Sequence, residues 1–415
     1  MPNHIPHSAE PGFRDIKRSL RNARDSQIEK VVAMVDIMRE RGAADGLIDP
    51  LRPRLSQLRP ARPLRFARLM FMPLNLLIAP AAHWRPGNAT VPRTTLRPLA
   101  DTVLREGGQE AHRILCDIEG STTADAALIT EAGDRLWRLA APILLTAPRP
   151  EGWEGTGLAL DVYAPLARKI GAVLRQIQAL TLLTDDAALG LMPPDPAIVG
   201  SMLRAVAADE PAAQPLLVAL LLARVPQVGP LVARAAASLE GPAAITLRMA
   251  IETAEDVVLQ QLDRPGMTEA QLNSGTISDA SAQVRSLSAL LWNLEIGGAP
   301  APRKAMLRSL RQRLDASCVS RFTQGLTDEL LVPLFELPAS QCQENVNRLE
   351  AAARGLRELE TIARPLGGAA VYDKLLLQAS DSVQQTGAAG ALARIDIIRL
   401  VEILAGPDAA LALLS

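Results

Sequence analysis

Apolar residues recur every three or four positions through most of this 415-residue chain, which is the spacing of one face of an α-helix. Between residues 11 and 41, for example, they stand at Phe13, Ile16 and Leu20 and resume at that spacing from Ile28, with charged residues between them. No segment alternates between apolar and polar residues for long enough to predict a strand, and β-branched residues do not cluster. The pattern therefore predicts an all-α protein without a significant β-sheet.

Proline and glycine divide this pattern into successive helices. Asp195 before Pro196 is typical of a helix start, because aspartate accepts hydrogen bonds from the first backbone amides and proline fits the first turn. A helix over residues 158–183 is expected to bend at Pro165. Further helices are predicted over residues 11–41, 94–106, 109–118, 124–145 (capped by Thr122 with Asp125), four pieces of 196–263, 278–296 (capped by Ser278), 303–322, 328–337, 340–363, 369–385, 391–404 and a short tail after Pro407.

The helices follow no fixed sequence period, so a regular repeat protein is not indicated. An irregular stack of antiparallel helices, loosely solenoid-like or a multi-helical bundle, fits the pattern best. The chain is also longer than one compact core needs. The predicted parts are an N-terminal amphipathic helix and loop (1–50), a cationic segment (51–100), a central helical domain (101–263), a polar linker (264–278) and a C-terminal helical domain (279–415).

The cationic segment, residues 51–100, differs from the rest of the chain in charge. It contains nine arginines and eight prolines, and no lysine, aspartate or glutamate. The chain as a whole has a formal net charge of −1, so the other parts are acidic in sum. Its middle, residues 62–78, is a dense apolar run that includes Phe66 and Phe71. Such a segment is expected to meet an anionic or a hydrophobic partner.

Three interpretations of this segment remain open. It could pack over the helical body of its own chain, since apolar segments usually become buried. It could be a docking site for another protein or a self-association surface, because arginine, methionine and aromatic residues are enriched at interface cores. It could also bind an anionic lipid surface or nucleic acid through its arginines. The residues predicted to contact a partner are Arg62, Arg65, Phe66, Arg68, Met70, Phe71, Trp84 and Arg85.

Candidate metal sites in the sequence are incomplete. His112, Cys116 and Glu119 could share one helical face, but no fourth ligand accompanies them. Carboxylates at 252, 255 and 256 share one side of a helix, yet no histidine follows a glutamate at the spacing that helical di-iron proteins use. The pair at 185–186 is interpreted as a helix start. No metal site and no cofactor is therefore predicted.

Signatures of catalysis are also missing from the sequence. The glycines between Gly152 and Gly157 resemble a phosphate-binding loop, but prolines rather than a strand precede them. No Walker A motif and no Gly-x-Ser-x-Gly nucleophile elbow occurs. The chain is therefore predicted not to be an enzyme, although an active site assembled from dispersed residues would escape this test.

The apolar runs are too short for membrane helices, which need about 20 apolar residues. The three cysteines are few and far apart, which favours reduced thiols, and no signal peptide is recognised. We expect a soluble, cytoplasmic protein. Its predicted function is that of a non-enzymatic helical scaffold or adaptor, which binds another protein or itself through the cationic segment and through grooves of the helical body. The alternatives are a peripheral binder of anionic membrane or nucleic acid, and a helical enzyme with a dispersed active site.

Overall fold

The structure is a computed structural model that describes residues 62–188, 193–263, 276–295, 301–336, 343–388 and 392–414, with Gln27, Ile28, Lys30, Val31, Met34 and Leu272 in addition. The predicted helix over 11–41 and most of the predicted linker 264–278 lie outside the described residues. The described part is all-α, which confirms the predicted fold class. Its strands are two-residue segments, β1 (Ile78–Ala79) and β2 (Val91–Pro92), which pair in parallel.

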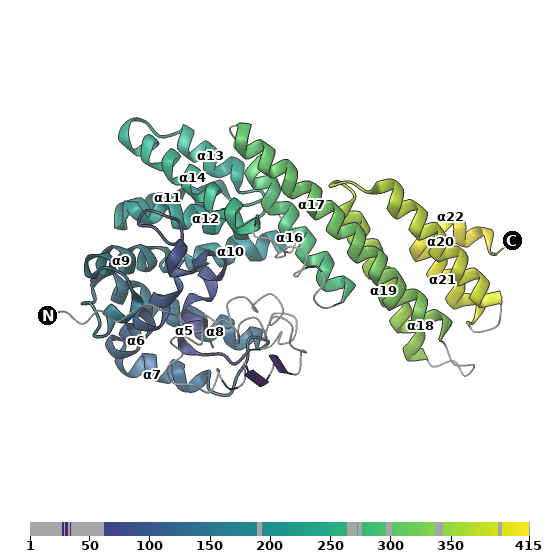
Figure 1. Cartoon of the computed structure of the whole chain (residues 1–415), viewed down its shortest axis with the longest axis horizontal. Helices are drawn as coiled ribbons and strands as arrows, with labels where there is room; N and C mark the ends of the chain where they lie inside the picture. The colour runs from purple at the N-terminus through teal and green to yellow at the C-terminus, as the bar shows by residue number, and fades with distance from the viewer. Residues whose placement is uncertain are drawn as a thin grey trace, which may run out of the picture.

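Figure 1 shows a rounded part, here called the lobe (residues 62–263), and an elongated part, here called the arm (residues 301–414). Helix α16 (Ile277–Glu295) lies between them. None of the described helices combines the length and the apolar character needed to cross a lipid bilayer.

The lobe begins with short elements and continues with longer antiparallel helices. The lobe elements are α5 (Phe66–Phe71), η2 (Met72–Leu77), η3 (Ala81–His83), η4 (Arg93–Thr95), α6 (Leu96–Glu106), α7 (Gly108–Asp117), α8 (Ala126–Thr146), η5 (Trp153–Thr156), η6 (Leu160–Val162), α9 (Tyr163–Leu174), α10 (Ile177–Ala188), α11 (Pro196–Asp209), η7 (Pro211–Ala213), α12 (Gln214–Arg224), α13 (Gly229–Ala237) and α14 (Gly241–Leu262).

The arm is built mainly from long helices that pack side by side. Its elements are α17 (Ala301–Gly325), the π-helical turn η8 (Leu326–Leu331), α18 (Val332–Phe335), α19 (Gln343–Ala363), α20 (Ala369–Ala388), α21 (Arg394–Ala405) and α22 (Pro407–Ala412). The π-helical turn joins α17 to α18 without a loop, where the sequence predicted two separate helices.

Local sequence signals place several helix starts correctly. The Asp195 side chain accepts a hydrogen bond from the backbone nitrogen of Ala197 at 2.7 Å, which confirms the predicted cap of α11. The predicted cap of α16 at Ser278 is wrong, because the helix begins at Ile277 and Thr276 precedes it. There the Asp279 carboxylate accepts hydrogen bonds from the backbone nitrogen and the hydroxyl of Thr276, at 2.8 and 2.9 Å, ahead of α16.

The predicted bend at Pro165 is also wrong. Pro165 lies in the first turn of α9, where a backbone amide has no acceptor inside the helix and a proline costs nothing. The chain instead breaks after α9, at Arg175 and Gln176. No proline or glycine stands at this break, so no local signal predicts it.

One connected set of buried apolar side chains runs through the lobe and the arm, from Leu64 to Leu404. Helix α12 lies deep in this core, because every residue from Leu216 to Leu222 is buried. Asn293 connects α16 to the lobe: its amide nitrogen donates to the carbonyl oxygens of Leu222 and Val225 at 3.0 and 2.9 Å. The buried amide of Asn293 thereby satisfies the carbonyls left at the end of α12.

Candidate functional site

The apolar residues of the cationic segment lie in the core of the lobe. Phe66, Met70, Phe71 and Trp84 are buried: at most 7% of the surface of each residue is exposed. These four members of the predicted contact set are therefore packed on their own chain, as in the interpretation that placed the segment over the helical body. They line the interior of the lobe, because a segment of this apolarity is removed from water by the nearest helices. Contact of these side chains with a partner stays a prediction.

Side chains of the helical body complete the hydrogen bonding of this segment. Two of its backbone carbonyls accept hydrogen bonds from side chains of the longer helices. Trp137 of α8 donates from its indole nitrogen to the Leu69 carbonyl oxygen at 3.1 Å. Arg224 at the end of α12 donates to the Met72 carbonyl oxygen at 2.9 Å. The segment is thus an integral layer of the lobe.

Lys169 of α9 also faces the segment from the helical body. Its side chain is buried, and its amino group donates to the Asn88 carbonyl oxygen at 3.4 Å. Burial lowers the pKa of Lys169 below its ordinary value of 10.5, while Glu210 acts in the opposite direction. The lysine holds the loop between β1 and β2 against α9.

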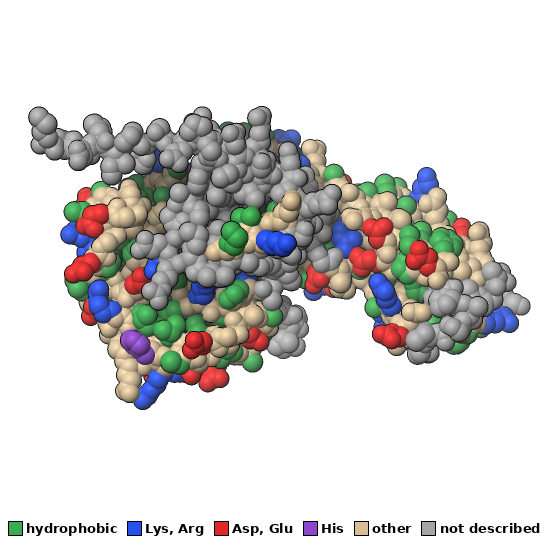
Figure 2. All heavy atoms as spheres, turned by 60° about the horizontal axis from the view of Figure 1, so that its bottom comes forward, with side chains coloured by type: hydrophobic (Ala, Val, Ile, Leu, Met, Phe, Trp, Pro, Cys, Tyr) green, Lys and Arg blue, Asp and Glu red, His purple; other side chains and the backbone are tan. Residues whose placement is uncertain are grey.

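The four arginines of the predicted contact set are less buried. Arg65 and Arg85 are exposed, and Arg62 and Arg68 are partly buried. The Arg85 guanidinium donates to the carbonyl oxygen of its neighbour Trp84 at 2.9 Å. In the face of the molecule shown in Figure 2, basic and acidic side chains are interspersed over the described surface. A role for these arginines in binding a partner stays a prediction.

The candidate metal clusters take structural roles in the described part of the chain. No group of three or more His, Cys, Asp or Glu residues there is arranged to hold a metal ion. His112 forms a hydrogen bond through Nδ1 with the Gly108 carbonyl oxygen of its own helix at 2.8 Å. The pair Asp185 and Asp186 lies near the end of α10, so its interpretation as a helix start is wrong.

The carboxylates of α14 pair with an arginine. Arg303, at the start of α17, donates to Glu255 at 2.5 Å and to Asp256 at 2.6 Å. The Glu255 side chain is 6% exposed, and burial raises its pKa to about 7 although Arg303 lowers it. This group joins the lobe to the arm.

A second set of buried polar side chains lies in the arm. Burial raises the pKa of the Cys318 thiol to about 12, so the thiol stays protonated at neutral pH and is a poor nucleophile. Burial likewise raises the pKa of Tyr372, whose ring meets Phe322 edge to face with centroids 5.1 Å apart. The set packs the arm and offers no activated group.

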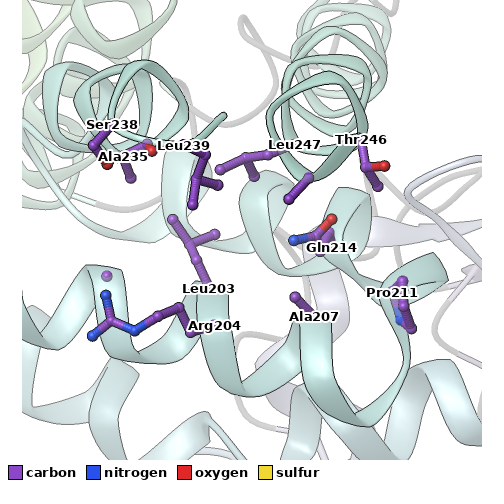
Figure 3. A pocket seen from close by; sticks show the side chains of 12 residues that line it. Leu203, Arg204, Ala207, Pro211, Gln214, Ala235, Ser238, Leu239, Thr246 and Leu247 are labelled. Carbon is purple, nitrogen blue, oxygen red and sulfur yellow. Dashed lines mark hydrogen bonds between the residues drawn. The ribbon is translucent and has the colours of Figure 1, made fainter. Parts of the chain in front are cut away.

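A pocket of about 350 Å³ opens in the lobe between α11, α12, α13 and α14, with η7 at one side (Figure 3). It is mostly apolar. Exposed residues such as Pro211, Ser238 and Thr246 form its mouth, and buried Leu203 and Leu247 lie deeper. The lining residues are Gly200, Leu203, Arg204, Ala207, Pro211, Gln214, Ala235, Ser238, Leu239, Ala243, Thr246 and Leu247.

Gln214 is the buried polar group of this pocket. It begins α12 directly after the turn η7, and its side chain points into the pocket in Figure 3 while being only 5% exposed. Its Oε1 atom is buried, and no described residue donates a hydrogen bond to it. Leaving a buried acceptor unpaired costs about 1–3 kcal/mol. A lobe selected for stability alone would favour an apolar residue at this position.

The other polar groups of the pocket lie toward its mouth. The hydroxyls of Ser238 and Thr246 donate to backbone carbonyls of Ala235 and Pro242, at 2.8 and 3.0 Å, so their remaining capacity is to accept hydrogen bonds. Arg204 is exposed and forms no ion pair with a described carboxylate. The pocket therefore combines an apolar interior, one buried amide and one cation at its edge.

Sequence reasoning missed this pocket because its lining comes from five separate elements. The one local signal was Gln214 itself, a polar residue at the head of the apolar run that becomes the buried helix α12. No protein-family model matches the chain, and comparisons with curated proteins and with solved structures find no similar protein.

Proposed function

We propose that this protein is a non-catalytic helical scaffold, and that it binds another protein by holding a segment of it in the pocket between α11, α12, α13 and α14. The observation that supports the proposal is the buried, unpaired amide of Gln214 within an otherwise apolar pocket. Binding sites commonly have this composition, an apolar lining with a few polar groups that fix orientation.

The lining favours binding over chemistry. Arg204 is the one ionisable side chain among the described lining residues, and a guanidinium offers hydrogen-bond donors but no acceptor. The Ser238 hydroxyl has no histidine, lysine or carboxylate beside it in the lining to act as a base. The volume of about 350 Å³ lies at the small end of the range of ligand pockets, about 300–1,000 Å³, and suits one or two apolar side chains of a bound segment.

A random-peptide phage library panned against the full chain tests this proposal. We expect enriched peptides that share an apolar residue, and we expect their binding to be lost when Ala207→Phe fills the pocket. Gly200→Leu provides a second filling variant, because a Cβ atom added at Gly200 meets nothing nearer than the end of the flexible Arg204 side chain, at 3.5 Å.

Ala208→Phe is the matched control. Ala208 is the exposed neighbour of Ala207 on α11 and is not part of the lining. Circular dichroism and thermal unfolding of each variant show whether the fold is retained. Enriched peptides that bind both filling variants as well as the unchanged protein, or no enrichment at all, would contradict a peptide-binding pocket.

A further inference from the structure

We infer that the bound segment is an acidic, apolar peptide, recognised through one of its backbone amides by Gln214 and through a carboxylate by Arg204. This inference rests on the proposed function and specifies the chemistry of the same pocket. It follows from the two polar groups that the pocket presents in addition to its apolar wall.

The carboxamide of Gln214 matches a peptide group. A primary amide offers one acceptor oxygen and a donor nitrogen, and a backbone peptide unit offers the complementary donor and acceptor. Rotation of the side chain by half a turn exchanges the oxygen and the nitrogen, so either atom can be the deeper one. The Oε1 atom has no donor among the described residues and is itself enclosed, so the carboxamide has to turn its oxygen toward the pocket to accept a backbone N–H of a bound segment.

Arg204 gives the mouth of the pocket a positive charge. It stands on α11 next to Leu203, and Figure 3 shows its side chain at a different side of the pocket from Gln214. No described carboxylate pairs with it, although Glu240 follows the lining residue Leu239 in the chain. An occupant that extends from Gln214 to the mouth would therefore bring its own acid to Arg204.

The separation of the two polar groups favours a chain over a small compact molecule. A peptide reaches both with one geometry: a backbone amide at Gln214, an apolar side chain against Leu203 and Leu247, and an acidic side chain farther along. Binding of a small amphipathic carboxylate in the same space is the alternative outcome.

The test uses a fluorescein-labelled peptide of the consensus obtained by panning, with binding followed by anisotropy. Arg204→Gln is expected to weaken binding by about threefold to fivefold, the range of an exposed ion pair. Gln214→Met is expected to weaken it by about tenfold, as for a lost hydrogen bond to a buried group. Arg248→Gln, an exposed arginine on α14 outside the lining, is the matched control and should leave binding unchanged.

Peptide variants test the same contacts from the other side. Replacing the peptide's acid by its amide should cost as much as Arg204→Gln, and the two changes together should cost little more than either alone. Reversing both charges, with Arg204→Glu and a lysine in the peptide, should restore binding. Methylation of one backbone nitrogen should weaken binding to the unchanged protein and have no further effect on Gln214→Met.

The outcomes separate this inference from the proposed function. Peptides that depend on an unfilled pocket but are indifferent to Arg204→Gln and Gln214→Met would overturn the inference and leave the proposed function standing. Peptides that bind Ala207→Phe as well as the unchanged protein would overturn both the inference and the proposed function. If a fatty acid such as decanoate bound selectively and no peptide competed with it, the pocket would be assigned to small carboxylates instead.

Discussion

Gln214 and Lys169 bring polar groups into the apolar interior of the lobe in different ways. Lys169 donates to a loop carbonyl, and its buried charge is tolerated because that contact fastens the loop between β1 and β2. Gln214 has no comparable structural contact at its buried oxygen. Most buried polar groups are hydrogen-bonded, so an unpaired one that points into a pocket supports a role in binding.

The stability of Gln214→Met tests this reasoning at the scale of one residue. Methionine has a similar length and no polar atom to leave unpaired, so we expect the free energy of unfolding to rise by about 1–2 kcal/mol. Urea denaturation followed by circular dichroism measures the change. The same substitution at Gln109, which is exposed on α7, should change stability by less than about 0.5 kcal/mol. A destabilised Gln214→Met would mean that the amide supports the fold.

At the scale of elements, the joint between lobe and arm depends on hydrogen bonds that cross between helices. Asn293 of α16 satisfies the end of α12, and Arg303 of α17 pairs with the acids of α14. The sequence correctly placed Glu252, Glu255 and Asp256 on one side of a helix, but it held no signal for the arginine, which is 47 residues beyond Asp256. Local spacing predicts which side chains share a helix face, but it does not predict which residues of other helices pack against that face.

Removing this arginine should have an effect that depends on pH. Arg303→Met removes the counter-charge of Glu255, and we expect the loss of stability to be about 1 kcal/mol larger at pH 8, where that carboxylate is ionised and paired in the unchanged protein, than at pH 5. The loss should shrink at pH 5. A carboxyl group with a raised pKa is protonated in the folded state below that pKa, so the penalty appears as pH rises through about 7.

Urea denaturation at the two pH values provides the measurement. Arg285, which pairs with Glu358 on the surface, is the matched control. Arg285→Met should cost less than about 1 kcal/mol at either pH, because both partners of this pair are exposed. An equal loss for Arg303→Met at pH 5 and pH 8 would show that the arginine acts through packing alone.

At the scale of the whole molecule, the described part of the cationic segment packs its apolar residues against the helices of the lobe and leaves others, such as Arg65 and Arg85, exposed. Its charge suggested a partner outside the chain, but its apolar residues are buried in the lobe, and three of its carbonyls accept hydrogen bonds from side chains of α8, α9 and α12. The pocket lies elsewhere, among α11 to α14. The feature that dominates the sequence is thus mainly structural, and the proposed binding site has almost no sequence signal.

Replacing Phe66, Met70 and Phe71 together by serine should abolish cooperative folding. Each large-to-small change in a core costs about 2–5 kcal/mol, and three of them approach or exceed the typical total stability of about 5–15 kcal/mol. Differential scanning calorimetry should show no unfolding transition. Serine at Leu182, Ile245 and Met249, each about 60% exposed, is the control and should leave a transition in place. A triple variant that stays folded would reinstate this segment as a docking surface.

The sequence by itself determined the features that depend on neighbours a few residues apart. It gave the all-α class, most helix boundaries and the cap at Asp195, because helical periodicity, capping and proline geometry act within one or two turns. It failed at the break after α9, where no local residue marks the change.

Only the tertiary structure decided what each helix face meets. The burial of the cationic segment, the pairing of Arg303 and the assembly of the pocket around Gln214 all join residues that are far apart in the chain. Burial is set by the shape that the other helices leave open, and no local pattern encodes that shape. The same apolar run can therefore become a core layer or a surface, and packing alone makes the choice.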